Sequence, residues 1–272
     1  MRDYFELPGG YKMPSLAYGT WLIKNEIAAE CVKNAIEVGY RHIDTAQAYE
    51  NEEGVGEGIR QSGIKREELF VTTKVKAEIK SYKKAKKSID ESLERLGLDY
   101  VDLILIHCPQ PWILFRGPKK FYKENREVWR ALEEAYKEGK VRAIGVSNFN
   151  GKDIQNLIDN CEIKPMVNQI LCHIGKTPTE IIDYCNKNDV VVEAYSPIAH
   201  GRALNDKAIV EMAKKYNVSV PQLCIKYTLQ LDTVSIPKAT SREHIEDNFK
   251  LDFEIKEEDM KSLLSLNKMT TY

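Results

Sequence analysis

Long apolar segments and paired cysteines are both missing from this sequence. The strongest apolar run, residues 103–106, is far shorter than the ~20 residues that a membrane-spanning helix needs, and it predicts a buried strand. The six cysteines form no C-x-x-C pair and no metal-ligand spacing, which disfavours a disulfide framework and a metal site. Residues 1–10 lack the apolar core of a signal peptide. These absences predict a cytoplasmic globular protein without a membrane or metal role.

An excess of charge of one sign is also missing. Forty Lys and Arg residues stand against 41 Asp and Glu residues, which leaves a formal net charge of −1. This balance gives no general attraction to nucleic acid or to acidic membranes. The densest basic run, residues 80–87, is therefore interpreted as a solvated helix face.

Strand-like and helix-like segments alternate along the 272 residues. Buried strands are predicted at 17–20, 42–44, 70–74, 101–107, 143–147, 166–169, 190–195 and 234–236, and amphipathic helices at 26–38, 52–61, 82–96, 126–138, 153–160, 179–188, 206–215 and 242–249. A further helical stretch follows at 256–266. Eight such strands favour a TIM (β/α)8 barrel over an open doubly wound sheet of five or six strands. We expect one domain over 1–272, with a short β-hairpin around Pro8-Gly-Gly at its start.

Four chemically useful side chains fall at or just beyond the ends of neighbouring predicted strands. Asp44, Lys74 and His107 end three consecutive strands, and Tyr49 follows Asp44 in the next loop. Each alone has a structural explanation, but the rim of a barrel brings all four together. A lysine beside a tyrosine favours the phenolate and lowers the tyrosine pKa, and a histidine can orient a carbonyl oxygen. The set predicts protonation of a carbonyl oxygen while a nicotinamide or flavin supplies hydride.

Residues 39–54, Gly-Tyr-Arg-His-Ile-Asp-Thr-Ala-Gln-Ala-Tyr-Glu-Asn-Glu-Glu-Gly, resemble the signature of the aldo-keto reductases. The resemblance continues at 73–74, 105–109, 145–149, 167–169, 194–197 and 236–238, and the pattern is similar to the bacterial 2,5-diketo-D-gluconate reductase-like members. It implies a (β/α)8 barrel, a nicotinamide cofactor and a catalytic tetrad of Asp44, Tyr49, Lys74 and His107, with Tyr49 as the general acid.

The same resemblance implies how the cofactor and substrate are held. Ser147, Asn148 and Gln169 would hold the nicotinamide carboxamide, and Tyr195 would stack on the ring. The other cofactor positions implied are Gly19, Thr20, Asp44, Ser196, Lys238, His244, Asp247 and Asn248. The substrate positions are Trp21, Tyr49, Lys76, His107 and Cys108. Independently of the resemblance, the insertions 109–125 and 198–205 follow the C-terminal ends of predicted strands and are candidate substrate or cofactor loops.

Two departures from the family pattern are informative. At the adenosine 2′-phosphate site, Ala239 stands for the usual serine and His244 for the usual arginine, so NADPH preference should weaken and NADH should also serve. Cys108 and Lys76 stand where tryptophans are common, which predicts a more open or more polar pocket.

The sequence therefore predicts an NAD(P)H-dependent reductase of small aldehydes or ketones, and the resemblance implies a monomer. The alternative is a barrel that binds the cofactor but acts as a redox sensor or structural partner, and Tyr49→Phe would separate the two.

Overall fold

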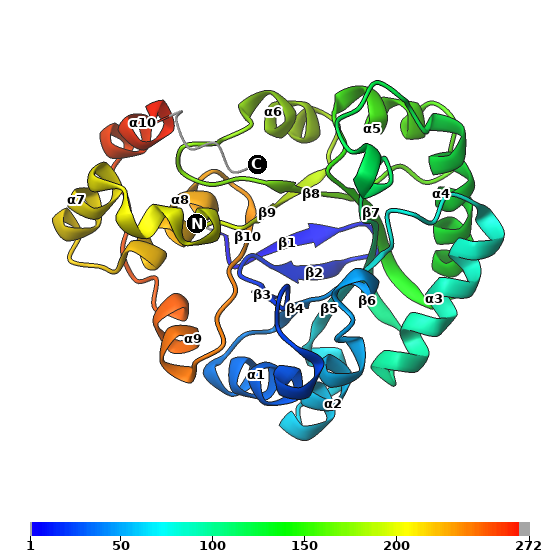
Figure 1. The fold of residues 1–272 in the computed structure, drawn as a ribbon, viewed down its shortest axis with the longest axis horizontal. Helices are drawn as coiled ribbons and strands as arrows, with labels where there is room; N and C mark the ends of the chain where they lie inside the picture. The colour runs from blue at the N-terminus through cyan, green and yellow to red at the C-terminus, as the bar shows by residue number, and fades with distance from the viewer. Residues whose placement is uncertain (1, 267–272) are drawn as a thin grey trace.

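Eight parallel strands form a ring at the centre of the molecule (Figure 1). The computed structural model describes residues 2–266. The strands of the ring, in chain order, are β3 (Tyr18–Gly19), β4 (His42–Asp44), β5 (Phe70–Val75), β6 (Val101–Ile106), β7 (Val141–Ser147), β8 (Val167–Leu171), β9 (Val191–Tyr195) and β10 (Val234–Ile236). Each strand pairs with the next one in the chain, and most are buried along their whole length.

The segment around β3 closes the ring against β10. The amide of Ala17 donates to the carbonyl of Ser235 (2.9 Å), the amide of Ser235 donates to the carbonyl of Ser15 (2.8 Å), and the amide of Gly19 donates to the carbonyl of Pro237 (2.8 Å). The predicted TIM barrel is thereby confirmed.

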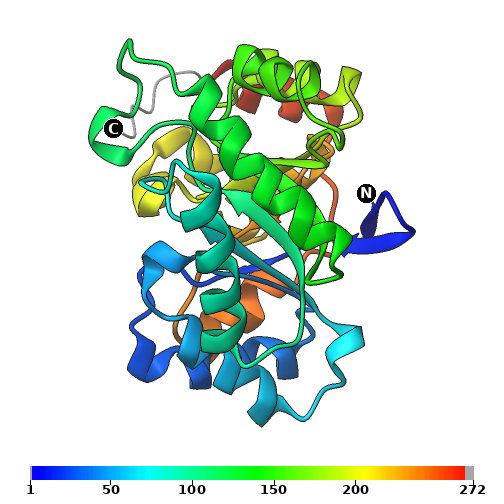
Figure 2. The ribbon, with the colours of Figure 1, turned by 90° about the vertical axis from the view of Figure 1, so that its right-hand side faces the viewer.

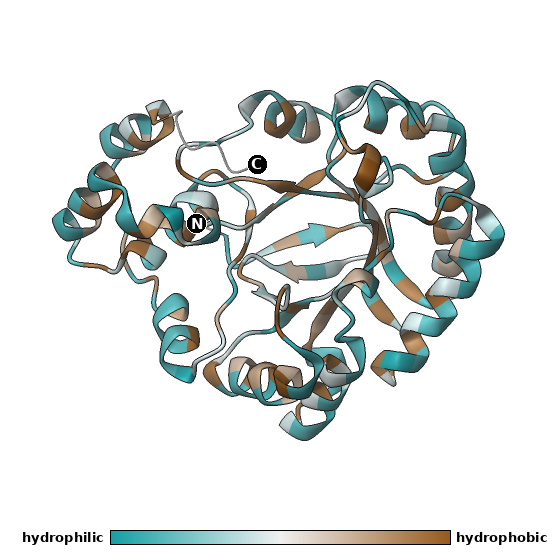
Figure 3. Cartoon of the chain, in the orientation of Figure 1, coloured by the Kyte–Doolittle hydropathy of each residue, from teal (hydrophilic) through white to brown (hydrophobic). Residues whose placement is uncertain are grey.

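Helices surround the ring and turn apolar faces towards it. They are α1 (Asn25–Val38), α2 (Glu52–Ser62), α3 (Tyr82–Leu96), α4 (Tyr122–Lys137), α5 (Gly151–Ile158), α6 (Thr179–Lys187), α7 (Lys207–Lys215), α8 (Val220–Gln230), α9 (Arg242–Phe249) and α10 (Glu257–Ser265). Figure 3 shows the strands largely apolar and the outer helix faces polar, as expected when one core lies between the layers. Among residues 2–266 no helix is long and apolar enough to cross a membrane.

The expected N-terminal hairpin is present as β1 (Tyr4–Leu7) and β2 (Tyr11–Pro14), paired antiparallel. It lies on the opposite side of the barrel from the long loop between β6 and α4 (Figure 2). Phe5, Leu7 and Met13 are buried, so the hairpin packs its apolar residues against the barrel core. This leaves the other end of the barrel, where the strands finish, for the functional site.

One helix was not predicted from the sequence. Helix α8 directly follows α7, and residues 222–229 are all buried. The buried residues include polar Gln222, Lys226 and Thr228, so the sequence lacks the one-sided apolar periodicity that predicts an amphipathic helix, and Pro221 reads as a helix breaker. In the structure Pro221 lies in the first turn, where proline is tolerated, and Ser219 and Gln222 form a capping box.

The loop after β6 is shorter than the expected 109–125, because α4 begins at Tyr122 rather than at residue 126. Buried Asn125 donates to the carbonyl of Pro109 (3.0 Å), which holds the first turn of the helix against the loop.

The interpretation of residues 80–87 as a solvated helix face is wrong for Lys80. Its Nζ donates to the carbonyl of Cys108 (2.8 Å) and to Oδ1 of Asn125 (2.9 Å), so it fixes this loop.

Candidate active site

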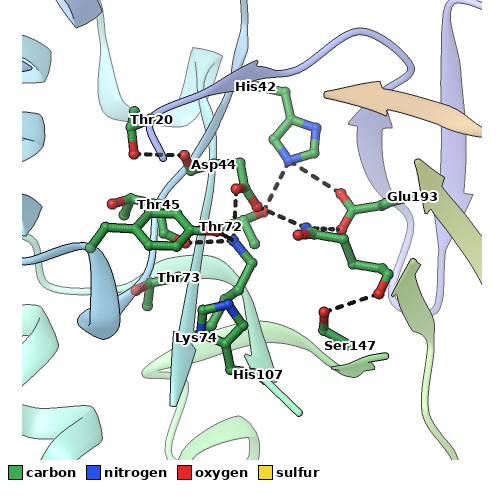
Figure 4. Close-up of polar contacts among 12 residues, drawn as sticks. Thr20, His42, Asp44, Thr45, Thr72, Thr73, Lys74, His107, Ser147 and Glu193 are labelled. Atoms are coloured by element: carbon green, nitrogen blue, oxygen red, sulfur yellow. Dashed lines mark hydrogen bonds and ion pairs between the residues drawn. The ribbon is translucent and has the colours of Figure 1, made fainter. Parts of the chain in front are cut away.

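The predicted tetrad comes together at the end of the barrel where the strands finish. Asp44 is the last residue of β4, Lys74 lies near the end of β5, His107 follows β6, and Tyr49 ends the short 3₁₀ helix η1 (Gln47–Tyr49). Side chains alternate between the two faces of a strand. Asp44 on β4 and Lys74 on β5 lie on the face that points into the barrel. Lys74 is completely buried, and its ammonium group faces Asp44 (Figure 4).

Lys74 is the centre of the site. Its Nζ lies 2.7 Å from Oδ1 of Asp44, 2.9 Å from the carbonyl oxygen of Thr45 and 3.2 Å from Oη of Tyr49. These three oxygens occupy the three hydrogens of one ammonium group. The arrangement holds a cation directly beside the phenol.

The charges at this site fix the protonation of Lys74 and Tyr49. Burial lowers the pKa of Lys74, but Asp44 and Tyr49 outweigh burial, and the net pKa lies above its usual value. Burial raises the pKa of Tyr49, and Lys74 opposes this without overcoming it. The lysine thus acts in the predicted direction, but the phenol of the described chain keeps its proton. A protonated tyrosine is the form that a general acid requires.

The ring of His107 lies edge-on to the phenol ring of Tyr49, with centroids 5.6 Å apart. Burial, and then the charge of Lys74, holds the pKa of His107 well below its usual value, so the ring is neutral. Its Nδ1 is buried without a hydrogen-bond partner among the described residues. An unpaired lone pair is less costly than an unpaired N–H, so we place the ring hydrogen on Nε2.

The residues expected to hold the nicotinamide lie beside the tetrad. Ser147 and Gln169 are neighbours in the register of β7 and β8. Asn148 follows with a φ of 62°, and its Oδ1 accepts a hydrogen bond from the hydroxyl of Tyr195 (2.8 Å). Its Nδ2 donates to the carbonyl of His107 (3.2 Å), so this cluster is joined to the tetrad.

Gln169 connects Asp44 to a buried acid that the sequence analysis did not single out. Its Nε2 donates to Oδ2 of Asp44 (2.8 Å) and to Oε2 of Glu193 (2.9 Å). Glu193 in turn lies 3.6 Å from Nε2 of His42. The available signal was a single acidic residue in the middle of the apolar strand predicted at 190–195.

Aromatic side chains border the mouth of the site. Trp112, in the short 3₁₀ helix η3 (Trp112–Leu114), lies edge-on to His107, with centroids 5.2 Å apart. The ring centroids of Trp21 and His200 lie 5.1 Å apart, and Trp21 is 40% exposed. Cys108, also predicted to face the substrate, is fully buried. Sequence reasoning named the loop of Trp112 but missed the residue itself. The aromatic residues within 109–125 were the sequence feature that could have identified Trp112.

Lys76 lies apart from these aromatic residues. With Glu50, Glu91 and Arg95 it lines a separate polar hollow near α3. None of the described contacts joins it to the tetrad.

The remaining cofactor positions lie around β3, β9 and α9. Thr20 donates to the carbonyl of Asp44 (3.0 Å) beside buried Gly19, and Ser196 follows β9 with a φ of 55°. Lys238 precedes α9 and is exposed, and on α9 itself His244 is exposed and Asn248 is buried.

Arg242 and Asp247, also on α9, are engaged with other parts of the chain. Arg242 pairs with Glu37 (2.7 Å) and Glu246 (3.0 Å). Oδ2 of Asp247 accepts a hydrogen bond from the hydroxyl of Ser219 (2.7 Å).

Comparison with known proteins gives the family. The model of the Aldo/keto reductase family matches residues 15–268. The chain belongs to this family. This aldo/keto reductase is 44% identical over 270 residues to glyoxal reductase of Bacillus subtilis (strain 168), covering 98% of this chain and 94% of the relative. It is 37% identical to an aldehyde reductase of Saccharomyces cerevisiae, covering 97% and 90%.

The fold of this aldo/keto reductase also matches solved structures. A Bombyx mori aldo-keto reductase in complex with NADP is 32% identical, superposes with a TM-score of 0.88, and is matched over 99% of this chain and 94% of that one. The predicted family and the predicted barrel are therefore both confirmed.

Proposed function

We propose that this chain reduces aldehydes or ketones to alcohols with a reduced nicotinamide cofactor, and that Tyr49 is the general acid. The observation that carries the proposal is the buried ammonium of Lys74, 3.2 Å from the phenol oxygen and 2.7 Å from the carboxylate of Asp44. Relatives named as glyoxal and aldehyde reductases support carbonyl reduction. A redox sensor or structural partner would not need this arrangement, so the alternative is not favoured.

The residues present fit a nicotinamide. Both N–H groups of the Gln169 amide are used by Asp44 and Glu193, which leaves its Oε1 as an acceptor for a carboxamide N–H. The half-buried ring of Tyr195 lies beside it at the end of β9. We infer that Gln169, Ser147 and Asn148 hold the carboxamide and that Tyr195 packs on the ring. When bound, the cofactor supplies the hydride.

The tetrad then handles the proton. We infer that Nε2–H of neutral His107 donates a hydrogen bond to the carbonyl oxygen of the substrate and places it near Oη of Tyr49. Tyr49 gives its proton to that oxygen as negative charge develops there. The phenolate left behind is stabilised by Lys74, whose charge Asp44 maintains.

The cofactor preference is proposed from the residues near α9. Lys238 provides one cation for a 2′-phosphate, whereas the imidazole of His244 is a weaker partner than the bidentate guanidinium of an arginine. Arg242 is held by Glu37 and Glu246 and does not compensate. We therefore propose NADP(H) as the cofactor with substantial use of NAD(H), and Asp247 and Asn248 near the adenine.

The substrate would enter between Trp21 and Trp112 and meet His107 and Tyr49. Lys76, which lines a different hollow, would reach the substrate only through a change of its side-chain conformation. A monomeric state, one domain over 1–272 and a cytoplasmic location stay predictions.

The test is cofactor oxidation followed optically with a panel of aldehydes and ketones, using NADPH and NADH in parallel for the wild type and Tyr49→Phe. We expect turnover by the wild type and a loss of roughly 10²–10⁴-fold in kcat for the variant, the usual contribution of general acid catalysis. Cofactor affinity should change little. Equal turnover by the two proteins would overturn the role of Tyr49, and a wild type inactive with every carbonyl would overturn the function.

A further inference from the structure

Glu193 lies inside the barrel one layer below the tetrad. It is fully buried on β9 and faces Gln169 of β8 in the register of the two strands. Its Oε2 and Oδ2 of Asp44 accept from the same Nε2 of Gln169, at 2.9 and 2.8 Å (Figure 4). The orientation of this amide therefore depends on two carboxyl groups, only one of which belongs to the tetrad.

His42 is the basic partner of Glu193. Its Nδ1 lies 3.2 Å from the carbonyl oxygen of Pro14, which can only accept, so Nδ1 carries a hydrogen. In the neutral ring Nε2 is then an acceptor. It lies 2.9 Å from Oγ1 of Thr72 and 3.6 Å from Oε1 of Glu193.

The distances indicate that no direct hydrogen bond joins Glu193 to His42, as a charge-assisted pair would have. Charge-assisted hydrogen bonds between nitrogen and oxygen measure about 2.7–2.9 Å, much shorter than the 3.6 Å observed here. Oε1 of Glu193 has no hydrogen-bond partner among the described residues. An ionised carboxylate would therefore bury a charged oxygen that receives no hydrogen bond, which is strongly unfavourable. A proton on Oε1 removes that charge.

We propose that Glu193 is a positioning residue for carbonyl reduction, and that it holds the amide of Gln169 as a neutral acid with its proton on the oxygen facing His42. This rests on the proposed function, because its purpose is to turn Oε1 of Gln169 towards the nicotinamide carboxamide. Neutrality matters because Asp44, the other acceptor of the same Nε2, already carries the charge that pairs with Lys74.

The surrounding titratable groups agree with this state. Burial, and then the charge of Asp44, raises the pKa of Glu193 to about 8, while Lys74 acts in the opposite direction. Burial lowers the pKa of His42 to about 4, with Asp44 opposing burial and Lys74 adding to it. When Glu193 ionises at alkaline pH, its charge raises the pKa of Tyr49 and makes Tyr49 a weaker acid.

Three variants test the proposal. Glu193→Gln is neutral at every pH and can keep both contacts, with its oxygen towards Gln169 and its NH₂ towards His42. Glu193→Leu keeps the volume but removes the acceptor. Val192→Ala is the matched control, because Val192 is buried on the opposite face of the same strand and reports structural damage alone.

The measurements are cofactor affinity from tryptophan fluorescence, kcat against pH, and the infrared carbonyl band of protonated carboxyl groups. We expect Glu193→Leu to weaken cofactor binding about tenfold, as loss of a buried hydrogen bond does, and Glu193→Gln to restore it. The fall of wild-type kcat above about pH 8 should move to higher pH in Glu193→Gln. The wild type should show a protonated-carboxyl band at neutral pH that Glu193→Gln lacks.

Three results would overturn the proposal. If Glu193→Gln binds cofactor as weakly as Glu193→Leu, or shows the same protonated-carboxyl band as the wild type, Glu193 is not a neutral acid. If Glu193→Leu binds cofactor like Val192→Ala, the positioning role is wrong. The infrared and binding measurements need no turnover, so they test Glu193 even if the wild type reduces none of the carbonyl panel and the proposed function fails.

Discussion

Two acid–base pairs lie one layer apart inside the barrel and differ in their charge. In the upper pair, Lys74 and Asp44 are 2.7 Å apart, and further oxygens complete the shell of the ammonium. In the lower pair, His42 and Glu193 are 3.6 Å apart, and one carboxyl oxygen has no partner among the described residues. All four side chains are buried, so burial alone does not decide the charge state. With the lower pair neutral, as proposed, the two pairs differ in distance and in the number of hydrogen bonds rather than in burial.

The largest effect should follow from breaking the upper pair. Lys74→Met leaves the carboxylate of Asp44 buried without its cation, and removal of one partner of a buried ion pair costs about 3–5 kcal/mol. We expect this loss in the free energy of unfolding, measured with denaturant at pH 7, together with loss of carbonyl reduction. A variant that unfolds like the wild type would show that Asp44 is not held as a charged partner of Lys74.

A smaller effect should follow from breaking the lower pair. His42→Leu removes partners from Thr72 and from the carbonyl of Pro14 but leaves no unpaired charge. Unsatisfied buried polar groups cost about 1–3 kcal/mol, and we expect a loss of that size in the same denaturant experiment. A loss as large as that of Lys74→Met would mean that the lower pair is charged as well, and the contrast between the pairs would disappear.

The pH dependence of stability should also separate the pairs. The pKa of Glu193 in the folded chain, about 8, lies above the ordinary value of 4.5, so the folded state binds more protons between these pH values. The stability that Glu193 contributes is therefore present at low pH and falls as pH rises through this window, by at most about 1.4 kcal/mol per pH unit. The wild type should lose stability relative to Glu193→Gln from pH 4.5 to 8. A difference independent of pH would indicate an ionised Glu193.

The smallest effect is expected at the exposed cofactor site outside the barrel. His244→Arg introduces a guanidinium that can bind a 2′-phosphate, but at the surface solvent weakens such contacts. We expect the ratio of kcat/KM for NADPH to that for NADH to rise about threefold to tenfold, as measured with one aldehyde. An unchanged ratio would show that His244 does not face the phosphate.

The tetrad could be predicted because it depends on the most regular property of the fold. Asp44, Lys74 and His107 stand at the ends of consecutive strands, and parallel strands of a barrel deliver their ends to one rim. The sequence resemblance then added the residues around Gln169. Helix α8 escaped because its burial on most sides removes the periodicity on which helix prediction depends.

The lower pair could not be predicted from the sequence, because its state depends on geometry between distant segments. Glu193 meets Gln169 through the register of β8 and β9, and His42 approaches it from β4 on another side of the barrel. The nitrogen–oxygen distances in the charged pair and in the neutral pair differ by less than 1 Å. The periodicity of a strand sequence does not predict distances with that precision. The net pKa of Tyr49 escaped for the same reason, since it depends on how burial balances against Lys74.

The closure of the ring between residues 15–19 and 235–237 has a consequence for synthesis on the ribosome. All four tetrad residues have been translated by residue 107, but the last strand of the barrel is more than a hundred residues away. Until β10 emerges, Asp44 and Lys74 remain in a partly formed sheet that water can reach. The backbone edge of residues 15–19, which later pairs with residues 235–237, has no partner strand at that stage. Contacts so far apart in sequence are slow to form and leave intermediates open to aggregation. A ribosome-bound chain that ends before β10 should therefore be captured by chaperones for much longer than one that includes it.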